Sequence, residues 1–335
     1  VMKKVGLAGF GTIGRRVANA VDKQPDMTVI GVAKKTPNLA SNTIQGKYKL
    51  YGVTNEDVGK LESADLETHG TLNKLTEESD IMVDVSPSGY GEKNKELYKD
   101  KNTKAIFQGG EQASIADESY NTYIAVNDDT DYGEKDYLRV VSCNTTGISR
   151  LISDIQSQIQ YIHVTLIRRA ADPNEPQKGP INDIVRSTNQ PSHHAEDVNE
   201  LFPSLNIHTM AVKAPITTMH MHSIDIELRN KSDFQLSQLK QKNRINVVPE
   251  PYDETSGQLS ELAITNSSGS IFGNVIWEDT FQRSQDRVRL FQGISQRDVT
   301  VPETIDAIRA ISGESIEESM ITTDEYLTIK NSMYY

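Results

Sequence analysis

The sequence contains one cysteine, Cys143, and its neighbours suit a nucleophilic thiol. An apolar run with strand character ends at Val141, and a helical pattern follows, which we expect to begin at about Thr145. A thiol at a helix N-terminus faces unpaired backbone N–H groups and the positive end of the helix dipole, and both favour the reactive thiolate. The surrounding Ser142, Asn144 and Thr145 add a polar, hydrogen-bonding environment. The alternative interpretation is a small, inert core cysteine.

A thiolate that attacks an aldehyde needs a nearby base and donors for the developing oxyanion, and histidine is the natural base at neutral pH. His220 and His222 are two residues apart in a run with strand character, so they share one face, and Met221 points the other way. A His-x-His pair can also bind a metal, but no second cysteine or matching acidic set is evident, so we predict no metal site. One of the two can instead be an ordinary sheet histidine.

The chain begins with a dinucleotide fingerprint, Gly9-x-Gly11-x-x-Gly14, between a strand-like run and a helical pattern. In such a motif the first glycine permits the tight turn, the second lets the pyrophosphate approach, and the third lets the helix pack on the strand. The alternative is a structural turn in a domain that has lost its ligand. Together with the cysteine and histidines, the motif suggests an aldehyde oxidised through a thioester, with the electrons passed to a nicotinamide.

The end of the second strand-like run favours NADP over NAD, with use of both cofactors as an open alternative. NAD sites usually carry an acidic residue there to bind the ribose hydroxyls. This sequence has Lys34, Lys35 and Thr36 at that position, and two cations with a hydroxyl can bind a 2′-phosphate. The alternative is that both lysines are only solvated.

Two pairs of basic residues can form a phosphate pocket. Arg168 and Arg169 end a strand-like run, and His193 and His194 follow Pro191 in what we expect to be a loop. Arginine offers planar donors that match phosphate oxygens. The alternative is a surface arginine pair that forms ion pairs with Asp172 or Glu175.

The spacing of apolar runs predicts an α/β protein with two domains. Strand-like runs alternate with polar helical segments over residues 1–141, which is typical of a doubly wound parallel sheet, so we predict an NAD(P)-binding Rossmann domain there. The strand-like runs are residues 5–8, 28–33, 81–85, 105–107, 123–126 and 138–141, and the helical segments include residues 15–22 and 92–101.

The pattern changes after a helix that we expect over residues 145–159. Several of the later runs alternate apolar and polar residues, which indicates a mainly antiparallel sheet with one covered face. We therefore predict an α+β catalytic domain over residues 142–300, and a C-terminal helix over residues 301–335 that packs back on the first domain. The later strand-like runs are residues 161–168, 209–213, 220–228, 274–278 and 288–291.

Composition narrows the function classes. A length of 335 residues allows two domains, and a net charge of −12 argues against general binding of nucleic acid or anionic membranes. One cysteine cannot form an internal disulfide, so we expect a cytoplasmic protein. We expect no signal peptide, because the N-terminus leads directly into a strand, and no membrane span, because no stretch of about 18 apolar residues occurs.

Several motifs resemble the archaeal-type (class II) glyceraldehyde-3-phosphate dehydrogenases, in that family's order across nearly the whole chain. The runs Ser-Cys-Asn-Thr-Thr and Pro-Ser-His-His are quite specific in combination. A departure is Ile216, which stands between Pro215 and a threonine pair, and residues 231–290 match weakly, so no role is transferred there. The motifs are residues 9–17, 107–111, 142–147, 168–173, 178–182, 191–194 and 219–222.

The resemblance implies a phosphorylating, reversible NAD(P)-dependent enzyme of glycolysis and gluconeogenesis, commonly a homotetramer, that acts on a triose phosphate and inorganic phosphate. It implies Cys143 as the nucleophile and His220, the first histidine of the pair, as the catalytic histidine. It also implies cofactor contacts from Thr12, Ile13, Gly110 and Gln296, and substrate or phosphate contacts from Ser142, Asn144, Thr145, Arg168, Arg169, His193 and His194, where one arginine can touch the cofactor instead.

Two other functions stay open at this point. An acyl-phosphate reductase such as aspartate-semialdehyde dehydrogenase shares the Rossmann domain, cysteine and histidine, but binds an amino-acid carboxylate. A non-catalytic nucleotide-binding redox sensor would bind the cofactor without turnover, and oxidation of Cys143 would be its main chemistry.

Overall fold

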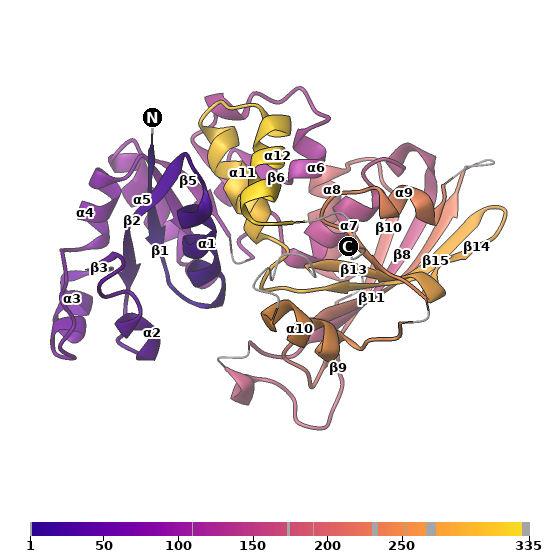
Figure 1. The fold of residues 1–335 in the computed structure, drawn as a ribbon, viewed down its shortest axis with the longest axis horizontal. Helices are drawn as coiled ribbons and strands as arrows, with labels where there is room; N and C mark the ends of the chain where they lie inside the picture. Colours follow the sequence, from indigo (N-terminus) through magenta and orange to yellow (C-terminus); the bar gives the residue numbers. More distant parts are fainter. Residues whose placement is uncertain are drawn as a thin grey trace. The chain divides into compact units, whose positions relative to one another are not determined.

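The computed structural model describes residues 2–108, 110–172, 175–189, 191–229, 234–250, 252–265 and 273–329. The chain forms two compact units, in the ribbon of Figure 1. The first unit comprises Val1–Val141 with Val301–Tyr326, and the second comprises Ser142–Thr300 with Leu327–Tyr335.

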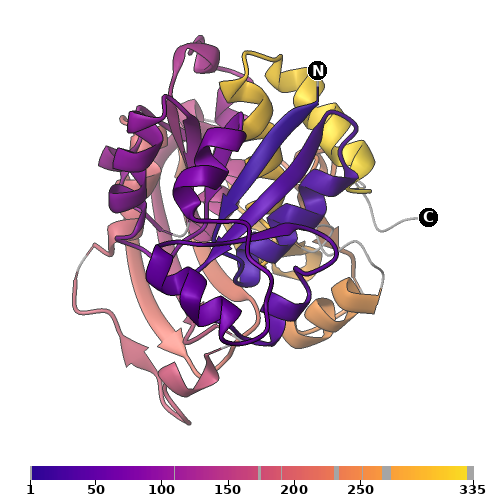
Figure 2. The ribbon, with the colours of Figure 1, turned by 90° about the vertical axis from the view of Figure 1, so that its left-hand side faces the viewer.

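The first unit is built on a seven-stranded sheet in which every strand pair is parallel. Its central strands are buried on both faces, so most of their residues are apolar. Figure 2 shows β1 and β2 side by side in this sheet. In sheet order, the strands are β3 (Lys49–Gly52), β2 (Met27–Lys34), β1 (Lys3–Ala8), β4 (Ile81–Asp84), β5 (Lys104–Phe107), β7 (Tyr137–Val140) and β6 (Glu118–Tyr120).

Helices connect these strands, and one of them replaces a predicted strand. Residues 123–126 were expected to extend, but Thr122–Ala125 form helix α6. The side chain of Asn121 caps this helix by accepting the backbone N–H of Tyr123 at 3.1 Å, and this local bond overrides the strand preference of the tyrosine and isoleucine. The other helices are α1 (Thr12–Lys23), α2 (Leu39–Asn42), α3 (Asn55–Glu62), α4 (Leu72–Glu78) and α5 (Gly91–Asp100), with 3₁₀ turns at Ala113–Ile115 and Tyr132–Glu134.

The C-terminal region of the first unit contains two helices, α11 (Val301–Ile311) and α12 (Ile316–Tyr326), so the prediction of one helix over residues 301–335 was wrong. The chain turns at Gly313, whose φ of +79° lies in the left-handed region that glycine adopts without strain. Residues 327–329 belong to the second unit, and residues 330–335 lie outside the described part of the chain.

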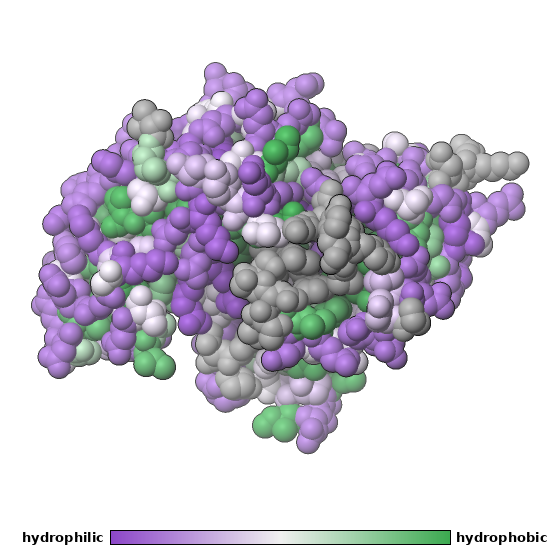
Figure 3. Space-filling view, viewed as in Figure 1, coloured by the Kyte–Doolittle hydropathy of each residue, from purple (hydrophilic) through white to green (hydrophobic). Residues whose placement is uncertain are grey.

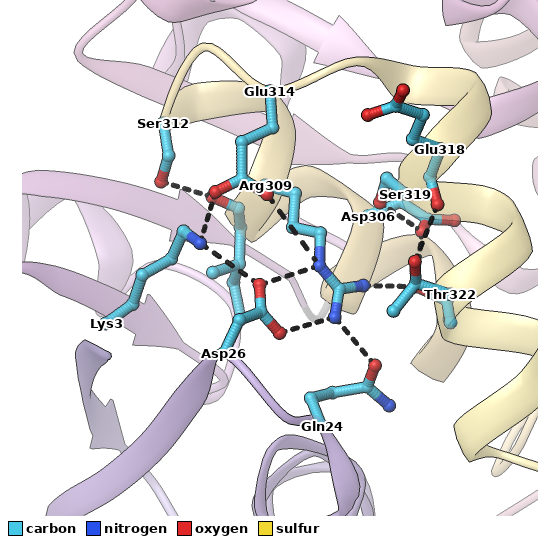
Figure 4. Close-up of polar contacts among 12 residues, drawn as sticks. Lys3, Gln24, Asp26, Asp306, Arg309, Ser312, Glu314, Glu318, Ser319 and Thr322 are labelled. Carbon is cyan, nitrogen blue, oxygen red and sulfur yellow. Dashed lines mark hydrogen bonds and ion pairs between the residues drawn. The ribbon is translucent and has the colours of Figure 1, made fainter. Parts of the chain in front are cut away.

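A partly buried ion pair connects α11 to the chain just before β2 (Figure 4). Arg309 of α11 has a side chain that is 3% exposed, and its Nη2 and Nε donate to the two carboxylate oxygens of Asp26 at 2.6 and 2.9 Å. Nζ of Lys3 on β1 donates to the same carboxylate at 3.1 Å, and Nη2 of Arg309 also donates to Oε1 of Gln24 at 2.8 Å. This bidentate contact fixes the position of the helix as well as stabilising it, because the guanidinium and carboxylate planes must match.

The second unit is built on an eight-stranded sheet that is mainly antiparallel, since among its described strands only β10 with β8 and β12 with β13 pair in parallel. The strands, in sheet order, are β12 (Asn246–Val248), β13 (Asn274–Trp277), β15 (Arg287–Ile294), β11 (His220–Leu228), β8 (Ile159–Arg169), β10 (Ile207–Ala214) and β9 (Val185–Arg186), with β14 (Gln282–Arg283) beside β15. The helices are α7 (Cys143–Ile152), α8 (His193–Leu201), α9 (Leu236–Lys240) and α10 (Ser256–Thr265), with 3₁₀ turns at Gln156–Gln158, Pro176–Lys178 and Glu278–Thr280.

On the face shown in Figure 3, hydrophilic residues cover most of the described surface, and hydrophobic residues occur in small separate groups. Among the described residues, no helix combines the length and apolar character that a bilayer crossing requires.

Candidate active site

The glycine fingerprint forms the turn from β1 into α1. Gly9 has a φ of +104°, and a Cβ on Gly14 would lie 2.5 Å from the carbonyl oxygen of Gly9, so neither position accepts a larger residue without strain. Gly11 differs, because a Cβ there would meet nothing within 4 Å. It is also the N-cap of α1, and no side chain caps that helix end. Open space at a helix N-terminus without a side-chain cap fits a pyrophosphate.

The end of β2 carries the residues predicted to select the cofactor. Lys34 is buried, and its Nζ donates to Oδ1 of Asn38 at 3.2 Å. Burial and the charge of nearby Arg15 lower the pKa of Lys34, so two cations lie close together here. Lys35 lies over the ring of Tyr90, 3.7 Å from the centroid, and Thr36 is exposed. Arg15 and Asn38 were missed, although Arg15 directly follows the last fingerprint glycine.

The remaining predicted cofactor residues fall in both units. In the first unit, Thr12 is buried in α1, Ile13 is half-buried, and Gly110 is exposed with a φ of +81°. Gln296 lies in the second unit, in a turn after β15, and its Oε1 is buried without a hydrogen-bond partner among the described residues.

Cys143 is the first residue of α7, two positions before the expected start of the helix. Ser142 is the N-cap, and its Oγ accepts the backbone N–H of Thr145 at 3.3 Å. Burial is the strongest influence on the Cys143 thiol and raises its pKa to about 11, although Arg169, Arg168 and the backbone N–H groups at the helix start lower it. The helix terminus therefore favours the thiolate, as predicted, but desolvation outweighs it.

The polar residues beside the cysteine are engaged within the second unit. The hydroxyl of Thr145 is buried, contacts Oγ of Ser142 at 2.9 Å and donates to the carboxylate of Asp197. Oδ1 of Asn144 lies 2.9 Å from Nε2 of His222. These contacts make Thr145 and Asn144 positioning groups for the start of α7, while Ser142 is half-buried.

The two histidines of β11 have different environments. His222 is fully buried between Asn144 and Gln292, whose Oε1 lies 3.4 Å from Nδ1 of the ring, so it is the ordinary sheet histidine. His220 is also buried, and burial is the main cause that holds its pKa well below the usual value. Its Nδ1 accepts the backbone N–H of Arg169 at 3.0 Å. The neutral ring of His220 therefore carries its proton on Nε2 and presents a hydrogen-bond donor.

Arg168 and Arg169 end β8, as predicted. The Nε atom of each is buried without a hydrogen-bond partner among the described residues. The alternative of an ion pair is present in part, since Nη2 of Arg169 lies 3.6 Å from the carboxylate of Asp172. Both guanidinium groups lower the pKa of Cys143 and of His220, so nucleophile and histidine lie in one positive field.

His193 and His194 open helix α8, so the expectation of a loop was wrong. Ser192 is the N-cap of this helix, and serine is common at that position. Its side chain makes no capping hydrogen bond with the described residues. The two rings lie 4.0 Å apart between centroids. His194 is buried, neither of its ring nitrogens has a partner in the described chain, and burial with the charges of His193 and Arg168 lowers its pKa to about 2.

Comparisons with known proteins agree with this arrangement. Residues 142–244 match the family model described as glyceraldehyde 3-phosphate dehydrogenase, C-terminal domain. A glyceraldehyde-3-phosphate dehydrogenase of Picrophilus torridus is 38% identical over 100% of this chain and 99% of its own length. Those of Haloarcula marismortui and Halobacterium salinarum are 42% and 40% identical, each over 98% of this chain and over 94% and 100% of their own lengths. The chain therefore belongs to the glyceraldehyde-3-phosphate dehydrogenase family, in its archaeal type.

Proposed function

We propose that this protein catalyses the reversible phosphorylating oxidation of D-glyceraldehyde 3-phosphate to 1,3-bisphosphoglycerate, with NADP as the preferred cofactor. One observation carries the proposal: the only thiol of the chain begins a helix in the field of two arginines that also act on His220, and the Nε atom of each arginine has no hydrogen-bond partner among the described residues. A nucleophile, a donor and an anion site in one unit are the groups that this reaction needs. The name shared by the relatives supports the same reaction.

The first step is addition of the Cys143 thiolate to the aldehyde carbon, which moves the carbonyl electron pair onto oxygen. The backbone N–H groups at the start of α7 and Nε2–H of His220 stabilise that oxyanion. We assign His220 this role in place of the proton acceptance expected from the sequence, because its Nδ1 is occupied by the N–H of Arg169. A thiolate adduct also has no hydroxyl proton to remove.

Oxidation of the adduct leaves a thioester on Cys143, and the thioester conserves the oxidation energy for acyl transfer. An oxygen of hydrogen phosphate then attacks the thioester carbon, the C–S bond breaks, and the proton of the phosphate passes to the departing sulfur. Arg168, Arg169, His193 and His194 bind the phosphate groups. The thiol loses this proton to solvent before the next turnover.

The first unit supplies the cofactor site. A bound nicotinamide dinucleotide provides the acceptor for the hydride. Gly9, Gly11 and Gly14 shape the pyrophosphate turn, and the open space at Gly11 fits that group. Buried Lys34, which donates to Asn38, and the nearby half-buried Arg15 supply two cations that suit a 2′-phosphate, and this favours NADP.

We also propose a cytoplasmic homotetramer with no nucleic-acid or membrane partner, which rests on the family resemblance and the net charge. A redox-sensor role is disfavoured by the thiol itself, because sensor cysteines are exposed and have a lowered pKa, whereas Cys143 is half-buried with a pKa of about 11.

The proposal is tested by measuring NADP reduction with glyceraldehyde 3-phosphate in the presence and absence of inorganic phosphate, beside Cys143→Ser. We expect turnover that depends on phosphate and is lost in the variant. Sustained turnover without phosphate would indicate a hydrolytic aldehyde dehydrogenase. Activity with aspartate semialdehyde in place of the triose phosphate would move the assignment to the acyl-phosphate reductases.

A further inference from the structure

The turn after β15 brings a further arginine, Arg297, to the end of the strands at which His220 lies. Ile294, the last residue of β15, is the register partner of His220, the first residue of β11. The chain then turns at once, because the N–H groups of Asp298 and Val299 donate to the carbonyl of Ser295 at 3.1 and 3.0 Å. Arg297 therefore lies in a fixed turn three residues beyond the partner of the proposed catalytic histidine.

Within the described part of the chain, the side chain of Arg297 has no counter-ion. Its Nε is buried without a hydrogen-bond partner, and the guanidinium forms no ion pair with any described residue. Two arginines of β15 behave differently, since Nε of Arg287 and Nε of Arg289 donate to the carboxylate of Asp225 at 3.0 and 3.1 Å. A partly desolvated cation without a partner is unfavourable, and an anion that binds to it recovers that free energy.

Arg297 also lies near the arginine pair already described. Burial is the largest cause of the lowered pKa of Arg169, and the positive charges of Arg168 and Arg297 lower it further. Asp172, 3.6 Å from Arg169, is the carboxylate that opposes this effect. Three guanidinium groups thus lie near the same strand ends, and Asp172 is the carboxylate that offsets their charge at Arg169.

We propose that Arg297 is a third phosphate-binding arginine of this site and sets its affinity for a dianionic phosphate group. The group can be inorganic phosphate or the phosphate ester of the triose, and both present the same oxygens to a guanidinium. The identity of the ligand rests on the proposed function, whereas the existence of an anion site at Arg297 does not.

The first test needs no activity. Inorganic phosphate is titrated into the full-length protein, and its binding is measured by calorimetry and by the shift in thermal midpoint for the wild type, Arg297→Gln, Arg297→Lys and the control Arg289→Gln. We expect Arg297→Gln to raise the Kd for phosphate about 10- to 100-fold, the usual effect of losing a charge-assisted hydrogen bond. Arg297→Lys, which keeps the charge without the planar donors, should lie between, and Arg289→Gln should match the wild type.

The thermal midpoint without phosphate separates binding from a structural role. Removal of an unpaired cation should leave the midpoint of Arg297→Gln at or above that of the wild type. A midpoint well below that of Arg289→Gln, or an unchanged Kd for phosphate in Arg297→Gln, would overturn the proposal.

Steady-state kinetics then distinguish the two sources of phosphate. A higher KM for inorganic phosphate alone would place Arg297 at the acceptor position, and a higher KM for glyceraldehyde 3-phosphate alone would place it at the substrate ester. A higher KM for NADP alone would refute the proposal, because Arg297 would then serve the cofactor. If the wild type does not oxidise the triose at all, the proposed function fails, but the phosphate titration still decides the role of Arg297.

Discussion

The raised pKa of the half-buried Cys143 thiol leads to a quantitative prediction about the free enzyme. With a pKa of about 11, Cys143 is about one part in a thousand thiolate at pH 8, whereas an exposed cysteine with a pKa of about 8.5 is about one quarter thiolate. Alkylation of Cys143 by iodoacetamide at pH 8 should therefore be about two orders of magnitude slower than alkylation of a free thiol. Because the chain has one cysteine, the mass of the intact protein reports this site alone, and Cys143→Ser is the blank.

The test is the dependence of the alkylation rate on pH. The alkylation rate should rise about tenfold per pH unit from pH 6.5 to 9.5 without a plateau. Arg168→Gln should slow the reaction at every pH, because its charge lowers the thiol pKa, and Arg289→Gln should not. A plateau below pH 9, or a rate at pH 8 equal to that of a free thiol, would show that the helix terminus outweighs burial and would refute the reasoning.

Three further perturbations follow from the first unit. Replacing Lys34 and Lys35 with Ala should raise the KM for NADP far more than that for NAD, and equal effects would contradict the NADP assignment. Asp26→Asn should lower the free energy of unfolding at pH 7 by about 2–3 kcal/mol in urea titrations, because Arg309 loses its carboxylate partner. Burial raises the pKa of Asp26, but its bonds to Arg309 and Lys3 outweigh burial, and the net pKa is lowered. The stabilisation is therefore complete above about pH 4 and is lost as the pH falls through the lower pKa of the folded state. A variant as stable as the wild type at pH 7 would exclude this role. Gly14→Ala should lower the thermal midpoint, because its Cβ would lie 2.5 Å from the carbonyl of Gly9, whereas Gly11→Ala should keep the midpoint and weaken cofactor binding; the reverse order would refute the roles given to the two glycines.

The fold was predictable where local pattern and burial coincide. In strand Ile81–Asp84 the first three residues are apolar and all four are buried, because both faces of the sheet are covered, and this gives a clear signal. The signal failed at residues 123–126, where strand-forming side chains sit in a helix because Asn121 caps it. It also failed at the C-terminus, where a periodic apolar pattern did not reveal the turn at Gly313.

In the candidate site, too, features set by neighbouring residues were predictable and contacts between distant residues were not. Motifs placed Cys143 at a helix start and Arg168–Arg169 at a strand end, because those features depend on neighbours in the sequence. The contacts that define chemical state come from distant residues, and spacing could not reveal them. Asp197 reaches Thr145 across 52 positions, and the N–H of Arg169 reaches Nδ1 of His220 across 51. The last contact decides which nitrogen of the ring carries the proton.

The same two arginines interact with two anions, the Cys143 thiolate and the proposed bound phosphate, so the binding of one anion affects the other. Arg168 and Arg169 lower the pKa of the Cys143 thiol, so they stabilise the thiolate, and they are also the proposed phosphate ligands. A bound phosphate reduces the positive field at sulfur, so it must raise the thiol pKa, and by linkage thiolate formation must weaken phosphate binding by the same factor. The antagonism suits the proposed order of steps, because the nucleophile forms best before the acceptor phosphate arrives. Once sulfur is acylated it carries no charge, and the arginines are then available to the phosphate that attacks the thioester.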